Sequence, residues 1–178
     1  KLNYLDLTGE SNIFPKISHK FCDMSENSTF NHFGLRLNTK ATRTEIELHL
    51  NGQGINTSIS NVSLINKKDH FSDENVLVNH NAYECKSRQV FKSVLDNDST
   101  SLVRGKIYVA PDAQKTDGYQ SSRSLLLNEK SKFFCKPELE IYADDVICSH
   151  GSTSGSLDRD SLFYLLSRGV HRNKAKEM

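Results

Sequence analysis

The run Thr44-Glu45-Ile46-Glu47-Leu48-His49-Leu50, followed by Asn51-Gly52-Gln53-Gly54, indicates the fold class. Successive side chains of an extended strand point to opposite faces, so Ile46, Leu48 and Leu50 share one face and the polar residues share the other. The asparagine and the two glycines that follow are typical turn residues. The run therefore predicts a half-buried strand that ends in a turn.

Similar alternating runs make up most of the chain as far as about residue 109. Turn residues separate them roughly every ten residues, and no helical period persists for more than two turns before residue 160. The pattern predicts an all-β protein, and without an exact internal repeat it is compatible with either a sandwich or a stacked β-solenoid. The further runs are Asn3–Leu7, Phe30–Leu37, Ile55–Ile65, Val76–His80 and Gly105–Val109.

Composition limits the partners and the compartment. The 178 residues carry 23 basic and 22 acidic side chains. The resulting net charge of +1 does not indicate binding to nucleic acid or to an anionic membrane. No window is apolar enough for a membrane-spanning helix, and no signal peptide is visible, so we expect one cytoplasmic or organelle-matrix domain. Because the chain starts at Lys1, we also expect a trimmed protein or a fragment.

The cysteines and most of the histidines give no local site. No C-x-x-C pair is present, which disfavours structural zinc and a thioredoxin-like site, and we expect reduced thiols. Five histidines stand singly in strand-like or turn-like contexts, and we predict solvated or core-edge positions without a functional role for them. The residues concerned are Cys22, Cys85, Cys135 and Cys148, and His19, His32, His49, His70 and His80.

The stretch Glu138–Ala143 alternates as a strand, and a second strand follows the Asp144-Asp145 pair. Two carboxylates are the working groups of sugar hydrolysis, but adjacent strand residues point to opposite faces, so a turn is the favoured interpretation of this pair. Cys148 and His150 share a face of the second strand. Thiolate and imidazole bind zinc, iron and iron–sulfur clusters, but two ligands are half a site. On spacing alone, a buried cysteine beside a hydrogen-bonded histidine is the favoured alternative.

A capped helix is predicted from Ser161 to Gly169. Asp158 is a suitable N-cap, and Gly169 can adopt the left-handed conformation that ends many helices. Leucines on one face, with Phe163 and Tyr164 beside them, give this short helix more apolar surface than it can bury alone. It is therefore expected to dock on the strands or on a partner.

Several ordered blocks of the sequence closely resemble the SufB/SufD family of iron–sulfur cluster assembly scaffolds. The resemblance is strongest between Val78 and His171. Within the family it is closest to the SufD members, because Gly151 follows His150 where SufB members place a carboxylate. The matching blocks are Cys85-x-Ser87-Arg88-Gln89-x-Phe91-Lys92, Gly105-Lys106-Ile107-Tyr108-Val109-x-Pro111-x-Ala113-Gln114-Lys115-Thr116-Asp117-x-Tyr119-Gln120, His150-Gly151-Ser152-Thr153-x-Gly155-x-Leu157-Asp158 and Leu162-Phe163-Tyr164-Leu165-x-Ser167-Arg168-Gly169-Val170.

The resemblance implies a right-handed parallel β-helix, with residues 1–155 as a core domain that lacks its N-terminal part and residues 156–178 as the start of a truncated C-terminal helical region. It also implies a non-enzymatic scaffold that pairs with SufB through the β-helix and with the ATPase SufC through the helical region. A nascent iron–sulfur cluster would be shared with SufB at the interface, with His150 as a candidate iron ligand and Cys148 beside it.

In isolation we expect no bound cluster, and we expect self-association through exposed strand edges. We expect a cytoplasmic protein, or in a eukaryotic host a protein of the plastid stroma or apicoplast. The alternative function is an extracellular polysaccharide-active or adhesive β-helix protein. That class predicts a secretion signal, solvent-facing aromatic residues and clustered acids, whereas the chain contains no tryptophan.

Overall fold

The computed structural model describes residues 1–10 and 14–177, which form eleven strands followed by two short helices. The elements are β1 (Leu2–Thr8), β2 (Lys16–Met24), β3 (Thr29–Leu37), β4 (Ala41–Leu50), β5 (Asn56–Ile65), β6 (Phe71–His80), β7 (Lys86–Leu95), β8 (Thr100–Val109), β9 (Thr116–Leu126), β10 (Lys132–Ile141), β11 (Val146–Ser156), α1 (Arg159–Ser167) and α2 (Arg172–Glu177).

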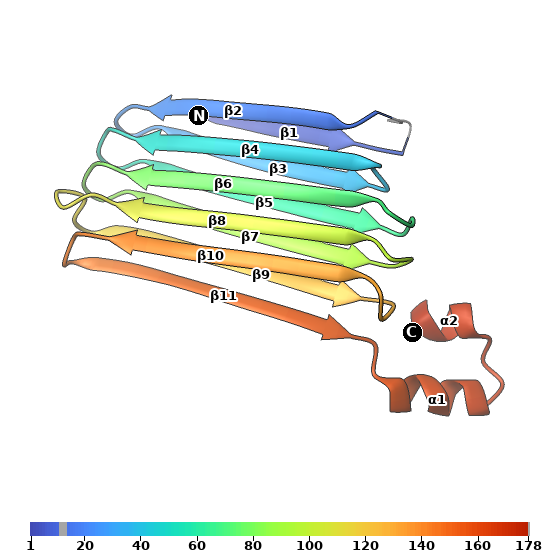
Figure 1. The fold of residues 1–178 in the computed structure, drawn as a ribbon. Coiled ribbons are helices and arrows are strands. Elements are labelled where there is room, and N and C mark those ends of the chain that lie inside the picture. The colour runs from blue at the N-terminus through green and yellow to red at the C-terminus, as the bar shows by residue number, and fades with distance from the viewer. Residues whose placement is uncertain (11–13, 178) are drawn as a thin grey trace.

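The strands wind into a parallel β-solenoid with two sheets (Figure 1). Odd-numbered strands form sheet A, in the order β1-β3-β5-β7-β9-β11, and even-numbered strands form sheet B, in the order β10-β8-β6-β4-β2. Asn56 pairs with Lys86 and Lys86 pairs with Asp117, so one full coil takes about 30 residues. The family resemblance implied a parallel β-helix, and the structure confirms it.

The interior between the sheets is apolar along one half of each coil and polar along the other. The second halves of the sheet B strands contribute a ladder of fully buried aliphatic side chains, in which Leu48 pairs with Val78 and Val78 pairs with Ile107. Near the opposite ends of the same strands, Ser63 hydrogen-bonds to Ser72 at 3.3 Å and Ser93 to Ser101 at 3.0 Å. Buried hydroxyls need such partners because unpaired polar groups are costly in an apolar core.

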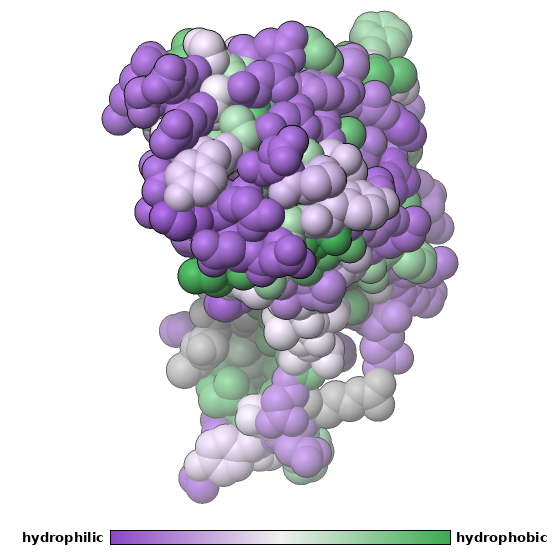
Figure 2. Space-filling view, turned by 90° about the vertical axis from the view of Figure 1, so that its left-hand side faces the viewer, coloured by the Kyte–Doolittle hydropathy of each residue, from purple (hydrophilic) through white to green (hydrophobic). Residues whose placement is uncertain are grey.

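Asparagine ladders join the turns of successive coils. At the end where sheet B strands finish, Asn51 Nδ2 donates to Asp23 Oδ1 at 3.2 Å, and Asn81 Nδ2 donates to Asn51 Oδ1 at 2.8 Å. Figure 2 looks onto this end, which is mostly hydrophilic. At the other end, Asn66 N donates to Asn38 Oδ1 at 2.8 Å, and Asn38 has a left-handed φ of 49°. Asparagine tolerates this conformation and bonds nearby backbone, which explains its place at the ends of the runs.

The spacing of the turns differs from the sequence prediction. Strands begin about every 15 residues, as at Ala41 and Asn56, because the runs read from the sequence are parts of longer strands. β2, β7 and β9 were not predicted, since their inward positions hold polar residues such as Lys20, Gln89 and Gln120 and break the apolar alternation. The Asp144-Asp145 turn is confirmed, but it connects strands of different sheets.

The predicted helix is confirmed as α1, shifted by two residues from the expected start. The Asp158 carboxylate accepts hydrogen bonds from the backbone N–H groups of Asp160 and Ser161. At the other end Gly169 has a φ of 80°, and Val170 N donates to Leu165 O at 3.1 Å, the pairing of a Schellman motif. Neither helix of the described residues is long and apolar enough to cross a membrane.

Candidate functional site

The candidate site lies on β11, the last strand of sheet A. β11 pairs in register with β9, and no described strand pairs with its other edge. The side of β11 that carries Val146, Cys148 and His150 corresponds to the interior face of the earlier coils. Among the described strands sheet B ends at β10, so none of them covers this face at the rim of the solenoid. In the described structure the inner face of β11 is therefore accessible at this rim.

Cys148 lies half-buried at the edge of this face. It packs against a small apolar cluster that includes Ile107 and Ala143, and its register partner is Gly118. A Cβ atom at Gly118 would lie 3.2 Å from Cys148 Sγ, so the glycine provides room for the sulfur atom. Burial raises the pKa of the Cys148 thiol, although a hydrogen bond from the Gly118 backbone opposes the shift. The thiol is therefore protonated at neutral pH and must lose its proton before it binds a metal.

His150, two residues further along β11, is exposed. Its register partner is Gln120, and none of the described residues hydrogen-bonds to its imidazole. The packing alternative required a hydrogen-bonded histidine, and the described neighbours do not supply that bond. Its ring nitrogens are therefore available to a metal or to a partner protein.

A polar ladder continues from His150 into the solenoid, through Gln120 on β9 to Gln89 on β7. Both glutamines are fully buried, and within the described chain neither amide atom of Gln120 has a hydrogen-bond partner. The Gln120 amide reaches across to Gly105 of β8, where a Cβ atom would lie 2.3 Å from its nitrogen. The sequence analysis missed this ladder, although polar residues at inward positions of a strand are a signal that could have revealed it.

A second group of buried charges lies near the N-terminal end of the solenoid, several coils away from His150. The Arg36 guanidinium, 1% exposed, donates to the Asp6 carboxylate at 3.0 Å and lies 3.6 Å from Glu74. Lys16 and Lys20 also bind Asp6, each at 3.0 Å. Bonds from these lysines and the charge of Arg36 lower the pKa of Asp6 against the effect of its burial. This group links side chains of the first coils and is separate from the site on β11.

The other histidines do not form a second site. His19 is exposed and His49 and His70 are partly exposed, as predicted, but His32 and His80 are buried inside the solenoid, which the sequence analysis did not predict. Both occupy inward positions of their strands, and His80, whose register partners are the buried Leu50 and Val109, has Nε2 2.8 Å from Ser87 Oγ. Burial lowers the pKa of each to about 4, so both are neutral at pH 7.

The donor set on β11 is limited to two groups. Across residues 1–10 and 14–177, no three histidine, cysteine, aspartate or glutamate side chains come close enough to hold a metal ion together. An imidazole and a thiol fit iron in an iron–sulfur cluster, whose ligands are mostly thiolates with histidine as a known replacement. The arrangement can therefore supply part of the ligand set for a cluster and requires the remaining ligands from another chain.

Comparison with known proteins identifies the family. The model of the SUF system FeS cluster assembly SufBD core domain matches residues 1–178. The chain is 32% identical over 177 residues to the iron–sulfur cluster assembly protein SufD of Escherichia coli, covering 99% of this chain and 42% of that protein. It is 25% identical over 163 residues to a SufBD family protein of Mycobacterium leprae, covering 87% of this chain and 41% of that protein.

A chloroplastic protein of Arabidopsis thaliana, ABCI7, is 41% identical over 91 residues, which cover 51% of this chain and 19% of that protein. The chain spans less than half the length of each of these three relatives. A family match over the whole chain, together with the two-sheet solenoid, shows that this chain belongs to the SufBD family of iron–sulfur cluster assembly proteins.

Proposed function

We propose that this chain is the core of a SufD-like scaffold subunit, which pairs with a SufB-like subunit and a SufC-like ATPase to build and transfer nascent iron–sulfur clusters. The single observation that carries the proposal is the exposed His150 beside the half-buried Cys148 on the uncovered inner face of β11. A scaffold needs ligands that a partner can reach, and these two groups meet that requirement.

In this proposal the nascent cluster is the cargo, shared between two chains and not retained by either. The His150 imidazole contributes a nitrogen ligand to iron, and the SufB-like partner contributes most of the thiolates. Cys148 acts as a neighbouring ligand or sulfur contact once its proton is lost, because only the thiolate binds metal. The chain performs no catalysis itself, and ATP hydrolysis belongs to the SufC-like partner.

The partner surfaces follow from the ends of the solenoid. Strands at an open rim have unpaired backbone N–H and C=O groups, which a partner strand can extend. These free strand edges support pairing with the SufB-like subunit through the β-helix, residues 1–155. In the same proposal, the helical region that starts at residues 156–178 contributes to SufC binding. The relatives are bacterial and chloroplastic, which supports the cytoplasm, or the plastid stroma in a plastid-bearing cell.

Anaerobic co-expression with SufB and SufC tests the ligand role. We expect His150→Ala to lower the iron and sulfide bound to the purified complex, while His19→Ala, which removes an exposed histidine of β2, leaves both at the wild-type level. Recovery of all three subunits in wild-type proportions establishes that the complex still forms. Unchanged iron and sulfide in an intact His150→Ala complex would exclude His150 as a ligand.

A further inference from the structure

The outer faces of the two sheets differ in character. On the outer face of sheet B, charged side chains of neighbouring strands pair with one another. Arg43 lies 2.6 Å from Glu45 and 3.3 Å from Asp73, and Arg104 lies 2.6 Å from Asp73. A face whose charges are already paired is adapted to solvent.

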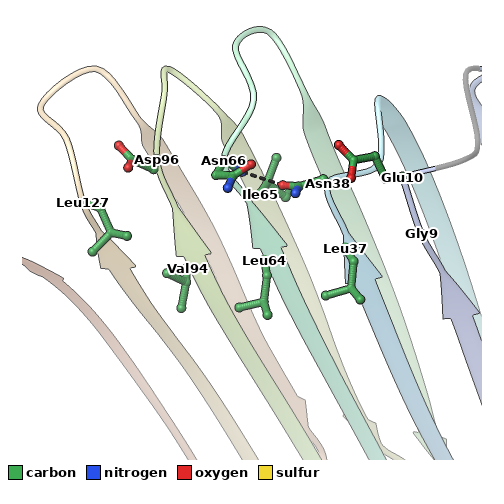
Figure 3. A pocket seen from close by; sticks show the side chains of 10 residues that line it. All are labelled: Gly9, Glu10, Leu37, Asn38, Leu64, Ile65, Asn66, Val94, Asp96 and Leu127. Carbon is green, nitrogen blue, oxygen red and sulfur yellow. Dashed lines mark hydrogen bonds between the residues drawn. The ribbon is translucent and has the colours of Figure 1, made fainter. Parts of the chain in front are cut away.

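The outer face of sheet A instead carries a row of aliphatic side chains. Leu37 pairs in register with Leu64, Leu64 with Val94, and Val94 with Leu125, on the consecutive strands β3, β5, β7 and β9. We call these four residues the leucine row, and its three leucines are 39–40% exposed. Figure 3 shows Leu37, Leu64 and Val94 side by side and pointing the same way. Because β1 and β11 lie beyond the row, the open ends of the solenoid do not account for its exposure.

Two basic side chains adjoin the leucine row. Lys92 and Arg123 pair in register on β7 and β9, two residues before Val94 and Leu125, and both are exposed. Among the described residues neither makes a hydrogen bond or an ion pair. The only carboxylate on the described outer face of sheet A is Asp117, which is bound to Arg88 at 2.6 Å. This face therefore has uncompensated positive charge next to its apolar row.

Leu37, Leu64 and Val94 of this row, with Leu127, line an open groove of about 550 Å³, walled by the turns that follow the strands (Figure 3). The carboxylates in that wall have contacts of their own, since Glu10 pairs with Lys67 and the Asp96 carboxylate accepts a hydrogen bond from Asn97 N at 2.9 Å. Rungs of a sheet are about 4.8 Å apart and turns of an α-helix about 5.4 Å, so a helix lying across the strands can place one apolar side chain near each rung. Four rungs span about 14 Å, the length of roughly ten helical residues.

We propose that the leucine row, with Lys92 and Arg123, is a docking site for an amphipathic α-helix of a partner protein that carries acidic residues beside its apolar stripe. The apolar stripe covers Leu37, Leu64 and Val94, and the acidic residues pair with the two basic side chains. This surface is separate from His150 and does not depend on the assembly function proposed above. A second copy of this chain is a poorer occupant, because the same two basic side chains would meet each other.

Binding of a designed peptide tests the proposal. The probe is a fluorescent helical peptide of about 14 residues with leucines at helical spacing and glutamates on the flanks, and the comparison peptide has lysine at every glutamate. We expect the acidic peptide to bind at least tenfold more tightly than the basic one, with a preference that shrinks as salt screens the charges. Lys92→Glu/Arg123→Glu should reverse the preference.

Matched variants locate the binding surface. Leu64→Asp should weaken binding of the acidic peptide at least tenfold, whereas Phe71→Asp, on the outer face of sheet B and also 39% exposed, should change it less than twofold. Circular dichroism checks the fold of each variant, and Leu64→Ser replaces any Leu64→Asp protein that fails to fold. Equal binding of both peptides, no binding, or an unaffected leucine variant would overturn the proposal. A dimer that Leu64→Asp dissociates would assign the row to a second copy instead.

Discussion

Glu74 offers the sharpest test of the polar interior. Its side chain is 2% exposed and accepts hydrogen bonds from Asn61 Nδ2 at 2.9 Å and from Ser72 Oγ at 3.3 Å. Arg36 Nε lies 3.6 Å from the same carboxyl group. Burial raises the pKa of Glu74 from 4.5 to about 7, and the nearby Arg36 charge only partly opposes this shift. The substitution to examine is Glu74→Gln, which keeps the shape of the side chain and removes its charge.

The sign of the effect follows from proton binding. Between pH 4.5 and 7 the folded chain holds a proton on Glu74 that the unfolded chain has released, so this residue makes the protein less stable as the pH rises. A shift of one pKa unit corresponds to about 1.4 kcal/mol, which gives a loss of about 2 to 3 kcal/mol between pH 5 and pH 8. Glutamine does not titrate, so the variant lacks this loss.

Urea denaturation of the two proteins at pH 5 and pH 8 measures the difference. Relative to wild type, Glu74→Gln should gain about 2 to 3 kcal/mol in free energy of unfolding on going from pH 5 to pH 8. Glu26→Gln, at an exposed turn position, should show no such gain. A stability difference that is the same at both pH values, or a wild type that becomes the more stable protein at pH 8, would mean that Glu74 is ionised in the fold and that its ion pair with Arg36 dominates.

Three further predictions concern the interior and the turns. Gly105→Val places a side chain where the Gln120 amide lies and should lower the free energy of unfolding by about 1–3 kcal/mol. The double variant Gly105→Val/Gln120→Ser removes the clashing amide and should recover part of this loss. A double-mutant cycle measured by urea denaturation that shows no recovery would contradict the clash. Burial lowers the pKa of His80 to about 4, so protonation of this residue in the unfolded chain reduces stability as the pH falls below about 6.5. Between pH 7 and pH 5, His80→Gln should gain about 2 kcal/mol in free energy of unfolding relative to wild type. If urea denaturation gives the same difference between the two proteins at both pH values, this prediction is refuted. Asn51→Ala removes two side-chain hydrogen bonds from the turn ladder and should cost about 1 kcal/mol, or a few degrees in the thermal midpoint, whereas an unchanged midpoint would show that the ladder adds no stability.

The sequence was most informative where the pattern depends on a single local element. The run at residues 44–50 lies within β4 with Ile46, Leu48 and Leu50 inward, as alternation predicted. The caps of α1 at Asp158 and Gly169 were also predicted correctly, because capping depends on residues within one turn of the helix end. The alternation of β11 placed Cys148 and His150 on one face, and the structure agrees.

Apolar alternation failed where the inside of the solenoid is polar. In β2 the exposed Ile17 and Phe21 point outward, while Lys16 and Lys20 point inward to bind Asp6, which reverses the expected pattern. A sequence pattern assumes that apolar side chains mark the core. It cannot recognise a strand whose inward residues belong to a buried ionic or hydrogen-bonded group.

By itself, the sequence determined the extended strands, their two-sided alternation, the asparagine-rich turns and the capped helix, since each follows from bonds and contacts within a few residues. The tertiary structure decided how the strands stack into two sheets, because that stacking pairs residues about 30 positions apart through coils whose turns vary in length and leave no fixed repeat. It also decided that His150 is accessible, since the exposure of an inward strand position depends on whether another strand lies opposite it.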